Sequence, residues 1–368
     1  MIRRKLKVKN KTRAVRRIGL LVLALVLAAG AVTAAVLLLR SAGTFSSLKE
    51  LPFTAESVYE YTGTGFLYVE NKKLFYCDNN DEKKNYSVEL SAPDVMLAGS
   101  PSITAVYNGY AMQIVGAEYP IEFSGQVRKV RCGGEFVAVL KSENGAETLQ
   151  IFNGSGTQVD QISFESSFLI DFGFYTSESE ILWTLSMETS GSEPISTITT
   201  YDLTKSATTG VINIQSHLIE EIKYSRNSLF VADTNHLTRF NPVRNNESWR
   251  IMIYGWRLAD SIIADKPYFL LIPRGATSLS TVKLLSVKEG DIPDETESVI
   301  HLPVNTVGAY LCSDKLIAVT PNEILTHSTT GNAEGKAALE TTVDRAEKLD
   351  SAHILLQSGS KLFIVTIK

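Results

Sequence analysis

The sequence predicts an all-β domain built from repeated four-stranded units and preceded by one membrane-spanning helix. Three observations lead to this prediction. First, a basic N-terminus is followed by an apolar stretch of 22 residues. Second, no helix-period pattern longer than a turn or two follows Glu50. Third, a pair of residues typical of the end of a strand, an apolar residue followed by a small or polar one, recurs every 37 to 49 residues. Such a repeat is typical of a β-propeller, in which four-stranded blades bury one another's faces around a ring.

The first 39 residues predict a membrane anchor. Residues 1–17 carry nine Lys and Arg and no acid, and residues 18–39 contain one polar side chain, Thr33. As a helix, the apolar stretch would measure about 33 Å, enough to cross a bilayer core of about 30 Å. Because cytoplasmic flanks collect basic residues, the tail is expected to lie in the cytoplasm. A signal peptide cleaved near Ala34 is the alternative.

The predicted organisation therefore has four parts. They are a basic cytoplasmic tail at 1–17, a transmembrane helix at 18–39, a short linker at 40–47 and an extracytoplasmic propeller at 48–368. Of the 36 Lys and Arg residues, 26 follow Arg40, whereas all 40 Asp and Glu residues do, so the outer part has a net charge of −14. A domain this acidic is not expected to bind the phosphate backbone of nucleic acids.

The strands of the outer part are predicted from short apolar runs that alternate or are rich in β-branched residues. Residues 65–69 and 135–140 are two such runs, and turn-forming residues such as those at 79–81 and 144–145 separate them. A β-sandwich would also have short strands, but it would not require a fixed period over more than 300 residues. The period therefore favours the propeller.

The repeat is marked by an apolar residue that ends a strand and is followed by a small or polar turn residue. The markers are Cys77-Asp78, Val115-Gly116, Phe152-Asn153, Tyr201-Asp202, Phe240-Asn241, Leu285-Ser286, His327-Ser328 and Val365-Thr366. One blade per marker predicts eight blades. Seven blades, with one marker misassigned, is the alternative.

The ends of the chain predict how the ring closes. The last unit offers three strands, near 343–347, 354–357 and 362–367, and the chain then ends. A spare apolar segment at 48–53 precedes the strands of the first unit. We expect this segment to pair with the last unit as its fourth strand, because the pairing would hide an open sheet edge.

Two turns carry a resemblance to known propellers. Residues 200–204 (Thr-Tyr-Asp-Leu-Thr) and 239–242 (Arg-Phe-Asn-Pro), the latter followed by Trp249, resemble repeats of the quinoprotein-like and WD40-like superfamily. The whole chain also resembles uncharacterised bacterial propellers that are anchored outside the cytoplasm by a basic tail and one span. The resemblance implies a propeller and, from the non-enzymatic members, a scaffolding role in the cell envelope. Quinone-binding members use adjacent cysteines, and no two cysteines adjoin here, so no cofactor is expected.

The residues that commonly carry chemistry form no recognisable motif. The five histidines contain no HxH, HExxH or HxxxH pair, and the three cysteines contain no CxxC pair. A zinc site would have to assemble from distant segments. Cys77, Cys132 and Cys312 lie in or beside apolar runs and are expected to be buried thiols, with a long-range disulfide as the alternative. The sequence thus predicts no catalytic, cofactor-binding or metal-binding residue.

Two groups of residues suggest where a ligand could bind. Four aspartates lie near the predicted inner strands, where they would face the mouth of a central channel or be solvated in loops. They are Asp171, Asp260, Asp265 and Asp344. An aromatic run at 164–175 is expected to pack between blades, with an exposed recognition surface as the alternative.

A scaffold without a catalytic motif favours a binding function. We expect a non-catalytic module that binds an envelope protein, peptide or glycan and is held in the membrane through residues 18–39. The alternative is an extracytoplasmic hydrolase or lyase whose carboxylates come together from different blades at the channel mouth.

Overall fold

The computed structural model describes residues 45–368 except 93, 190, 226–227, 264–265 and 289–293. The predicted tail at 1–17 and transmembrane helix at 18–39 lie outside the described residues. Within the described part of the chain, no helix is long and apolar enough to cross a membrane. The elements found there are strands and one short 3₁₀ helix, η1 (Glu82–Lys84).

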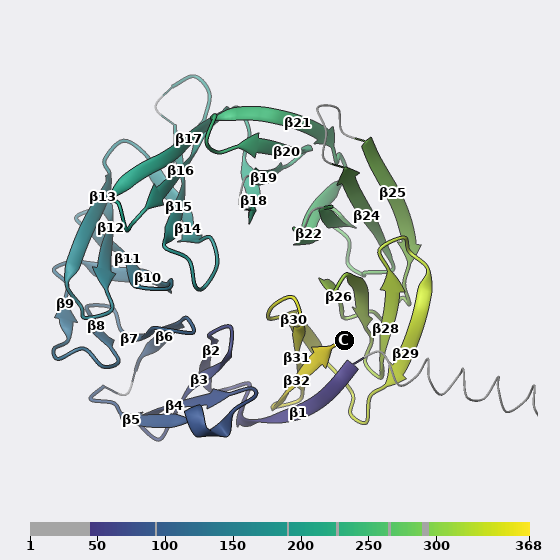
Figure 1. Cartoon of the computed structure of the whole chain (residues 1–368), viewed down its shortest axis with the longest axis horizontal. Coiled ribbons are helices and arrows are strands. Elements are labelled where there is room, and N and C mark those ends of the chain that lie inside the picture. The colour runs from purple at the N-terminus through teal and green to yellow at the C-terminus, as the bar shows by residue number, and fades with distance from the viewer. Residues whose placement is uncertain (1–44, 93, 190, 226–227, 264–265, 289–293) are drawn as a thin grey trace, which may run out of the picture.

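The 32 strands form eight antiparallel sheets of four, arranged as blades around a ring (Figure 1). The first four blades follow one another along the chain. Their strands are β2 (Val58–Tyr61), β3 (Gly65–Glu70), β4 (Lys73–Asp78) and β5 (Tyr86–Glu89) in blade 1; β6 (Met96–Gly99), β7 (Thr104–Tyr107), β8 (Ala111–Ile114) and β9 (Ile121–Glu122) in blade 2; β10 (Gln126–Cys132), β11 (Phe136–Glu143), β12 (Ala146–Asn153) and β13 (Gln158–Phe164) in blade 3; and β14 (Phe168–Phe174), β15 (Ile181–Glu188), β16 (Ile195–Asp202) and β17 (Ala207–Gln215) in blade 4.

The remaining blades continue the ring, and the last one takes its outer strand from the N-terminal side of the chain. Their strands are β18 (Ile219–Ser225), β19 (Ser228–Asp233), β20 (His236–Asn241) and β21 (Asn246–Met252) in blade 5; β22 (Trp256–Ile262), β23 (Tyr268–Pro273), β24 (Thr281–Lys288) and β25 (Asp294–His301) in blade 6; β26 (Gly308–Cys312), β27 (Lys315–Val319), β28 (Glu323–Ser328) and β29 (Ala333–Ala338) in blade 7; and β30 (Arg345–Lys348), β31 (His353–Ser358), β32 (Lys361–Ile367) and β1 (Phe45–Thr54) in blade 8.

The predicted ring closure is confirmed. Strand β1 pairs antiparallel with β32, from Phe45 opposite Ile367 to Thr54 opposite Lys361, and lies beside it in Figure 1. Eight blades are present, so the alternative of seven is wrong. The strand begins at Phe45, three residues before the predicted linker boundary, because the ladder with β32 extends to the end of that strand.

The repeat markers have a common structural position and a local cause. Each lies at or within about three residues of the end of the third strand of its blade. In five blades the marker's side-chain oxygen accepts hydrogen bonds from backbone N–H groups two to four residues further along. These residues are Asp78, Asn153, Asp202, Asn241 and Ser328. The side chain therefore shapes the turn that leads to the outer strand.

The hydrophobic core lies between blades. Eight clusters of buried apolar residues are found in the described part of the chain, and each joins two neighbouring blades. The cluster at the closure contains Leu51 and Phe53 of β1, Phe66 and Tyr68 of β3, and Leu355 of β31. A blade can bury both faces of its sheet only when its two neighbours are present, which explains why the fold closes on itself.

Candidate functional site

The antiparallel strands divide the loops between two faces of the ring. One face carries the loops that lead into each innermost strand and those that join the second and third strands; we call it the distal face. The other, proximal face carries the remaining loops. Phe45, the first residue of β1, is paired with Ile367 at the end of β32, which places the start of β1 at the proximal face. The chain therefore enters the ring on the side opposite to the distal loops.

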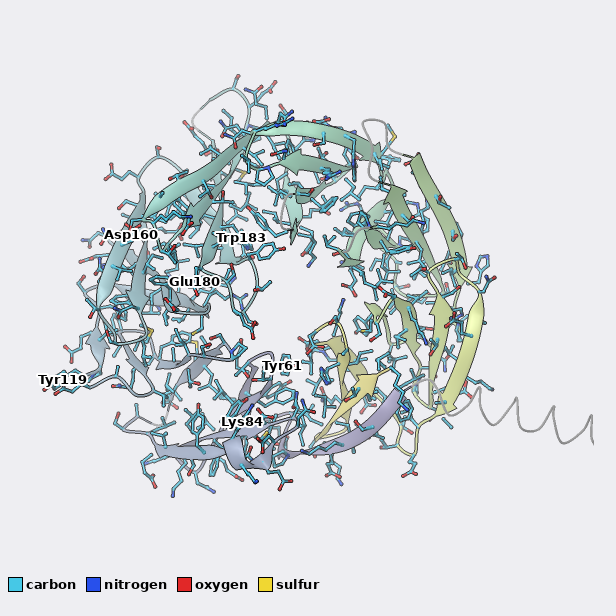
Figure 2. The ribbon with its side chains drawn as sticks, in the orientation of Figure 1. Tyr61, Lys84, Tyr119, Asp160, Glu180 and Trp183 are labelled. Carbon is cyan, nitrogen blue, oxygen red and sulfur yellow. The ribbon has the colours of Figure 1, made fainter. Side chains whose placement is uncertain are left out.

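Exposed apolar side chains are concentrated on the distal face. Of the 16 large apolar side chains exposed among the described residues, eight lie at the ends or in the loops that form this face, namely Val58, Met96, Tyr110, Phe168, Leu218, Met252, Tyr254 and Val304. Three lie on the proximal face: Tyr86, Tyr119 and Val243. Tyr119 projects from the outer rim of the ring (Figure 2). Groups of exposed apolar side chains mark interaction surfaces in soluble domains.

Three of the distal residues surround the hairpin between β19 and β20. Leu218, Met252 and Tyr254, which we call the distal apolar patch, are 57%, 70% and 77% exposed. Met252 is the cross-strand partner of His236, and the N–H of Ile253 donates to the carbonyl of Asn235 at 2.7 Å. The segment that carries Met252 and Tyr254 is therefore hydrogen-bonded to this hairpin, which helps to preorganise the surface.

The central channel is lined by the innermost strands. A cavity of about 770 Å³ is bounded by residues of blades 4, 5, 6 and 8. In four neighbouring blades the innermost strand contains a β-bulge at the same place, and the residue after the bulge is charged. These residues are Lys129, Asp171, Glu221 and Asp260. Since a bulge bends its strand and redirects the adjacent side chain, the four blades present a charged group at equivalent positions.

Three carboxylates of the innermost strands each lie against a lysine. Lys129 Nζ lies 2.5 Å from Asp171 Oδ1, and Lys223 Nζ lies 2.7 Å from Glu221. Lys348 Nζ lies 2.8 Å from both carboxylate oxygens of Asp260. The pairs of Asp171 and Asp260 therefore join blades, whereas Glu221 and Lys223 both lie on β18. A fourth carboxylate, Glu60 of β2, lines a cavity of about 330 Å³ together with Asp171, and burial raises the pKa of Glu60.

The four aspartates noted in the sequence occupy different positions in the structure. Asp171 and Asp260 lie on innermost strands and take part in the ion pairs of the channel. Asp344 lies in the loop before β30, where its carboxylate accepts a hydrogen bond from the N–H of Gly359 at 2.7 Å. Asp265 lies outside the described residues. The sequence therefore located two channel residues, but not the lysines that neutralise them.

A second polar network lies where blade 8 meets blade 1. The hydroxyl of Tyr61 donates to Asp350 Oδ2 at 2.5 Å, and Asp350 lies 2.8 Å from His353 Nδ1. Figure 2 shows Tyr61 on the inner side of the ring. Burial and then the hydrogen bond to Asp350 raise the pKa of Tyr61. Although burial alone would raise it, hydrogen bonds from His353 and Tyr61 lower the pKa of Asp350 to about 2. The network therefore holds a carboxylate in its ionised form at the seam of the ring.

The cysteines and the aromatic run have mainly structural positions. Cys132 and Cys312 are buried, Cys77 is half-buried, and all three are free thiols. Burial raises the pKa of Cys312 to about 12, which makes it a poor nucleophile. In the aromatic run, Phe172 is buried between blades, whereas Phe168 is 62% exposed on the distal face. The packing prediction is thus correct for Phe172, and Phe168 fits the alternative of an exposed surface.

One cluster was not predicted from the sequence. His217, in the loop before β18, lies next to Asp233 and His236, which flank the turn between β19 and β20. The histidines are 19 residues apart in the sequence, so short-spacing motifs do not detect them. The usable signals were the turn sequence Asp-x-x-His and the position of both segments in loops of the same face.

Comparisons with known proteins identify the fold. No family model matches the sequence, and no curated protein matches it. Among solved structures, the WD40 domain of SCAP from fission yeast has a TM-score of 0.59 at 10% identity, covering 87% of this chain and 98% of that one. The chain shares the β-propeller fold of this domain.

Two other propellers are similar over nearly the whole domain. BamB from Moraxella catarrhalis has a TM-score of 0.53 at 10% identity, covering 88% of this chain and 98% of that one. The computationally designed protein Ika8 has a TM-score of 0.55 at 9% identity, covering 89% of this chain and 100% of that one. At such identities the likeness concerns the fold alone, so the function has to be argued from the surface.

Proposed function

We propose that this protein is a membrane-anchored, extracytoplasmic propeller that binds a partner protein of the cell envelope through its distal face. The observation that carries the proposal is the concentration of exposed apolar side chains on that face, above all the distal apolar patch of Leu218, Met252 and Tyr254. Tyr and Met are favoured at protein interfaces because they bury a large area at little cost in hydrogen bonds.

The geometry of the proposed anchor supports the use of the distal face. If the span ends at residue 39 and β1 begins at Phe45, the five residues 40–44 separate them. Five residues span at most about 17 Å when extended. The proximal face would then lie near the bilayer, and the distal face would point away from it toward other proteins.

The alternative of a hydrolase or lyase receives less support from the channel. Such an enzyme would need a carboxylate free to exchange a proton with its substrate. The carboxylates of Asp171, Glu221 and Asp260 are each paired with a lysine. Ion pairs of this kind favour a structural role for these three carboxylates. The enzyme alternative rests instead on Glu60, whose pKa is raised by burial in a smaller cavity.

Charge substitution on the two faces tests the binding proposal. The full chain would be produced in its native membrane, cross-linked in intact cells and purified with its partners. Met252→Glu with Tyr254→Glu should reduce the recovered partner at least about tenfold, because a charge is desolvated in the interface. Val243→Glu with Tyr119→Glu is the matched control, since these residues are 80% and 70% exposed on the proximal face. Equal recovery from both double variants would contradict the proposal.

The proposed topology has a separate test. Ser155 lies in an exposed turn, so the variant Ser155→Cys adds a reactive thiol to a chain whose native thiols are buried or half-buried. A maleimide that cannot cross membranes should label this variant in intact cells. Labelling that requires cell lysis would place the propeller in the cytoplasm and overturn this part of the proposal.

A further inference from the structure

We propose that His217, Asp233 and His236 form a binding site for a divalent transition-metal ion of the zinc type. The potential ligand atoms of the three residues all lie within 4.8 Å of one another. Two imidazoles and one carboxylate are a common ligand set for zinc that leaves a fourth position open. The inference does not depend on the proposed binding function.

The measured distances fit a metal site. Asp233 Oδ2 lies 3.3 Å from Nδ1 of His217, and Asp233 Oδ1 lies 3.4 Å from Nδ1 of His236. A tetrahedral ion with ligands at about 2.1 Å keeps them about 3.4 Å apart. Each imidazole therefore lies at a suitable distance from the carboxylate, although the two face different oxygens of Asp233.

The hydrogen bonds of the cluster leave one ligand atom unused. Nδ1 of His236 is buried and has no hydrogen-bond partner. A buried polar atom without a partner is costly, and a bound ion would satisfy it. Nδ1 of His236 also lies beside the carboxylate of Asp233, so one ion could bind both groups.

A similar turn elsewhere in the chain contains an aspartate and a histidine whose side chains are hydrogen-bonded to each other. Asp350 and His353 have the same spacing as Asp233 and His236, and in both turns the aspartate accepts the backbone N–H of the histidine. In the Asp350 turn, His353 Nδ1 lies 2.8 Å from the carboxylate in hydrogen-bonding geometry, and Tyr61 donates to the same group. The Asp233 turn lacks this geometry and has a second imidazole instead.

The charge around the cluster is compatible with a cation. The carboxylate of Asp233 is buried, and no Lys or Arg in the described part of the chain forms an ion pair with it. The nearby Arg274 pairs with Glu220 at 2.7 Å and donates to the carbonyl of Thr234, and it attracts Asp233 without forming an ion pair with it. Because a buried carboxylate without a full positive charge in contact is unfavourable, a metal ion between it and the two imidazoles would stabilise it.

The backbone holds the ligands in place from two blades. Asp233 Oδ1 accepts the N–H groups of Asn235 and His236 at 2.6 and 2.7 Å, which shapes the turn. The hydroxyl of Ser196, on β16 of blade 4, donates to the carbonyl of His217 at 2.9 Å. The side chains of His217 and His236 remain 27% and 21% exposed, so an ion can reach the site from solvent.

Zinc titration of the full chain tests the inference. The protein would be purified in detergent without a histidine tag, stripped with EDTA and titrated with Zn²⁺ against a coloured chelator. We expect one Zn²⁺ per chain, and a loss of more than about 100-fold in affinity for His217→Ala and for His236→Ala, since even outer-shell partners contribute 10- to 100-fold. His353→Ala and the exposed His301→Ala are matched controls and should bind as the native chain does.

Two results would overturn the inference. One is the lack of stoichiometric binding by the native chain, and the other is binding that His217→Ala and His236→Ala leave unchanged. X-ray absorption of the zinc-loaded native chain identifies the zinc ligands directly, so this test does not depend on whether the variants fold. Two imidazoles in the zinc shell support the site, and a shell without two imidazoles contradicts it.

Discussion

At the residue scale, buried ion pairs in the channel determine which single side chains matter most. Asp260 is buried on β22, accepts hydrogen bonds from Lys348 of blade 8, and also accepts the N–H of Leu311 in blade 7 at 2.8 Å. One carboxylate therefore connects three blades. Removing one member of such a pair leaves an unpaired, largely buried charge.

Replacement of Asp260 is predicted to be far more harmful than replacement of its equivalent in blade 4. Asp260→Ala should lower the free energy of unfolding by about 3–5 kcal/mol, because it leaves the ammonium group of Lys348 without its carboxylate partner. Asp171→Ala should cost about 1 kcal/mol or less, since the Asp171 and Lys129 side chains are 43% and 34% exposed. Urea unfolding of both variants measures the difference, and equal losses would contradict the role given to burial.

The seam carboxylate Asp350 predicts a loss of stability in acid. Its pKa is about 2 in the folded chain against an ordinary value of 3.8. A lowered pKa stabilises the fold above pH 4, and this contribution of about 2 kcal/mol disappears as the pH falls from about 4 to 2. Asp350→Asn should therefore be less stable than the native chain at pH 7 and equally stable near pH 2. Urea unfolding across this range checks it, and a difference that does not change with pH would refute it.

Whether the role of a residue could be predicted depended on how far apart in the sequence its interaction partners lie. The turn role of Asp202 or Asn241 depends on backbone groups within four residues, so the sequence shows it directly as a repeat. The contact of His217 with Asp233 depends on how two loops approach one another, and the pairing of Asp260 with Lys348 spans 88 residues. Interactions of the second kind leave no local pattern, which is why the sequence did not predict them.

At the element scale, the closing strand β1 is the least local part of the fold. Its partner β32 lies more than 300 residues away in the sequence, yet the pairing was predicted because the last unit lacked a strand. Phe53 anchors β1, with its ring centroid 4.8 Å from that of Tyr68 and 5.5 Å from that of Phe66. The strand thus contributes both a sheet edge and a core side chain.

Truncation of Phe53 is predicted to weaken the closure. Phe53→Ala should lower the free energy of unfolding by about 3–5 kcal/mol, because the ring is 5% exposed and leaves a cavity between blades 8 and 1. Phe168→Ala is the matched control at an exposed position and should change stability by about 0.5 kcal/mol or less. Chemical denaturation of both variants gives the values, and a small loss for Phe53→Ala would argue that β1 contributes little to the ring.

The bulged inner strands were beyond sequence prediction. A bulge depends on which residues face one another across two strands, and Leu258 to Asp260 reads as ordinary strand sequence. Strand boundaries were likewise approximate, since β24 continues to Lys288 beyond the marker at Leu285. The number and order of the blades were predictable because each blade has one turn marker at the end of its third strand.

At the scale of the whole molecule, the start of the ring and the exposed apolar side chains lie on opposite faces. The start of β1 lies on the proximal face and the distal apolar patch lies on the other. A membrane anchor a few residues before β1 would therefore present the patch to partners and keep the proximal loops near the lipid. The same arrangement leaves the His217 and Asp233 cluster accessible beside the patch.

Site-specific photo-cross-linking tests this central claim most directly. A photoreactive amino acid would replace Tyr254 on the distal face or Val243 on the proximal face of the full chain in its native membrane, since both residues are more than three-quarters exposed. The account predicts a discrete cross-linked product with a second protein from position 254 and none from position 243. Products of equal yield from both positions, or a product from position 243 alone, would contradict it.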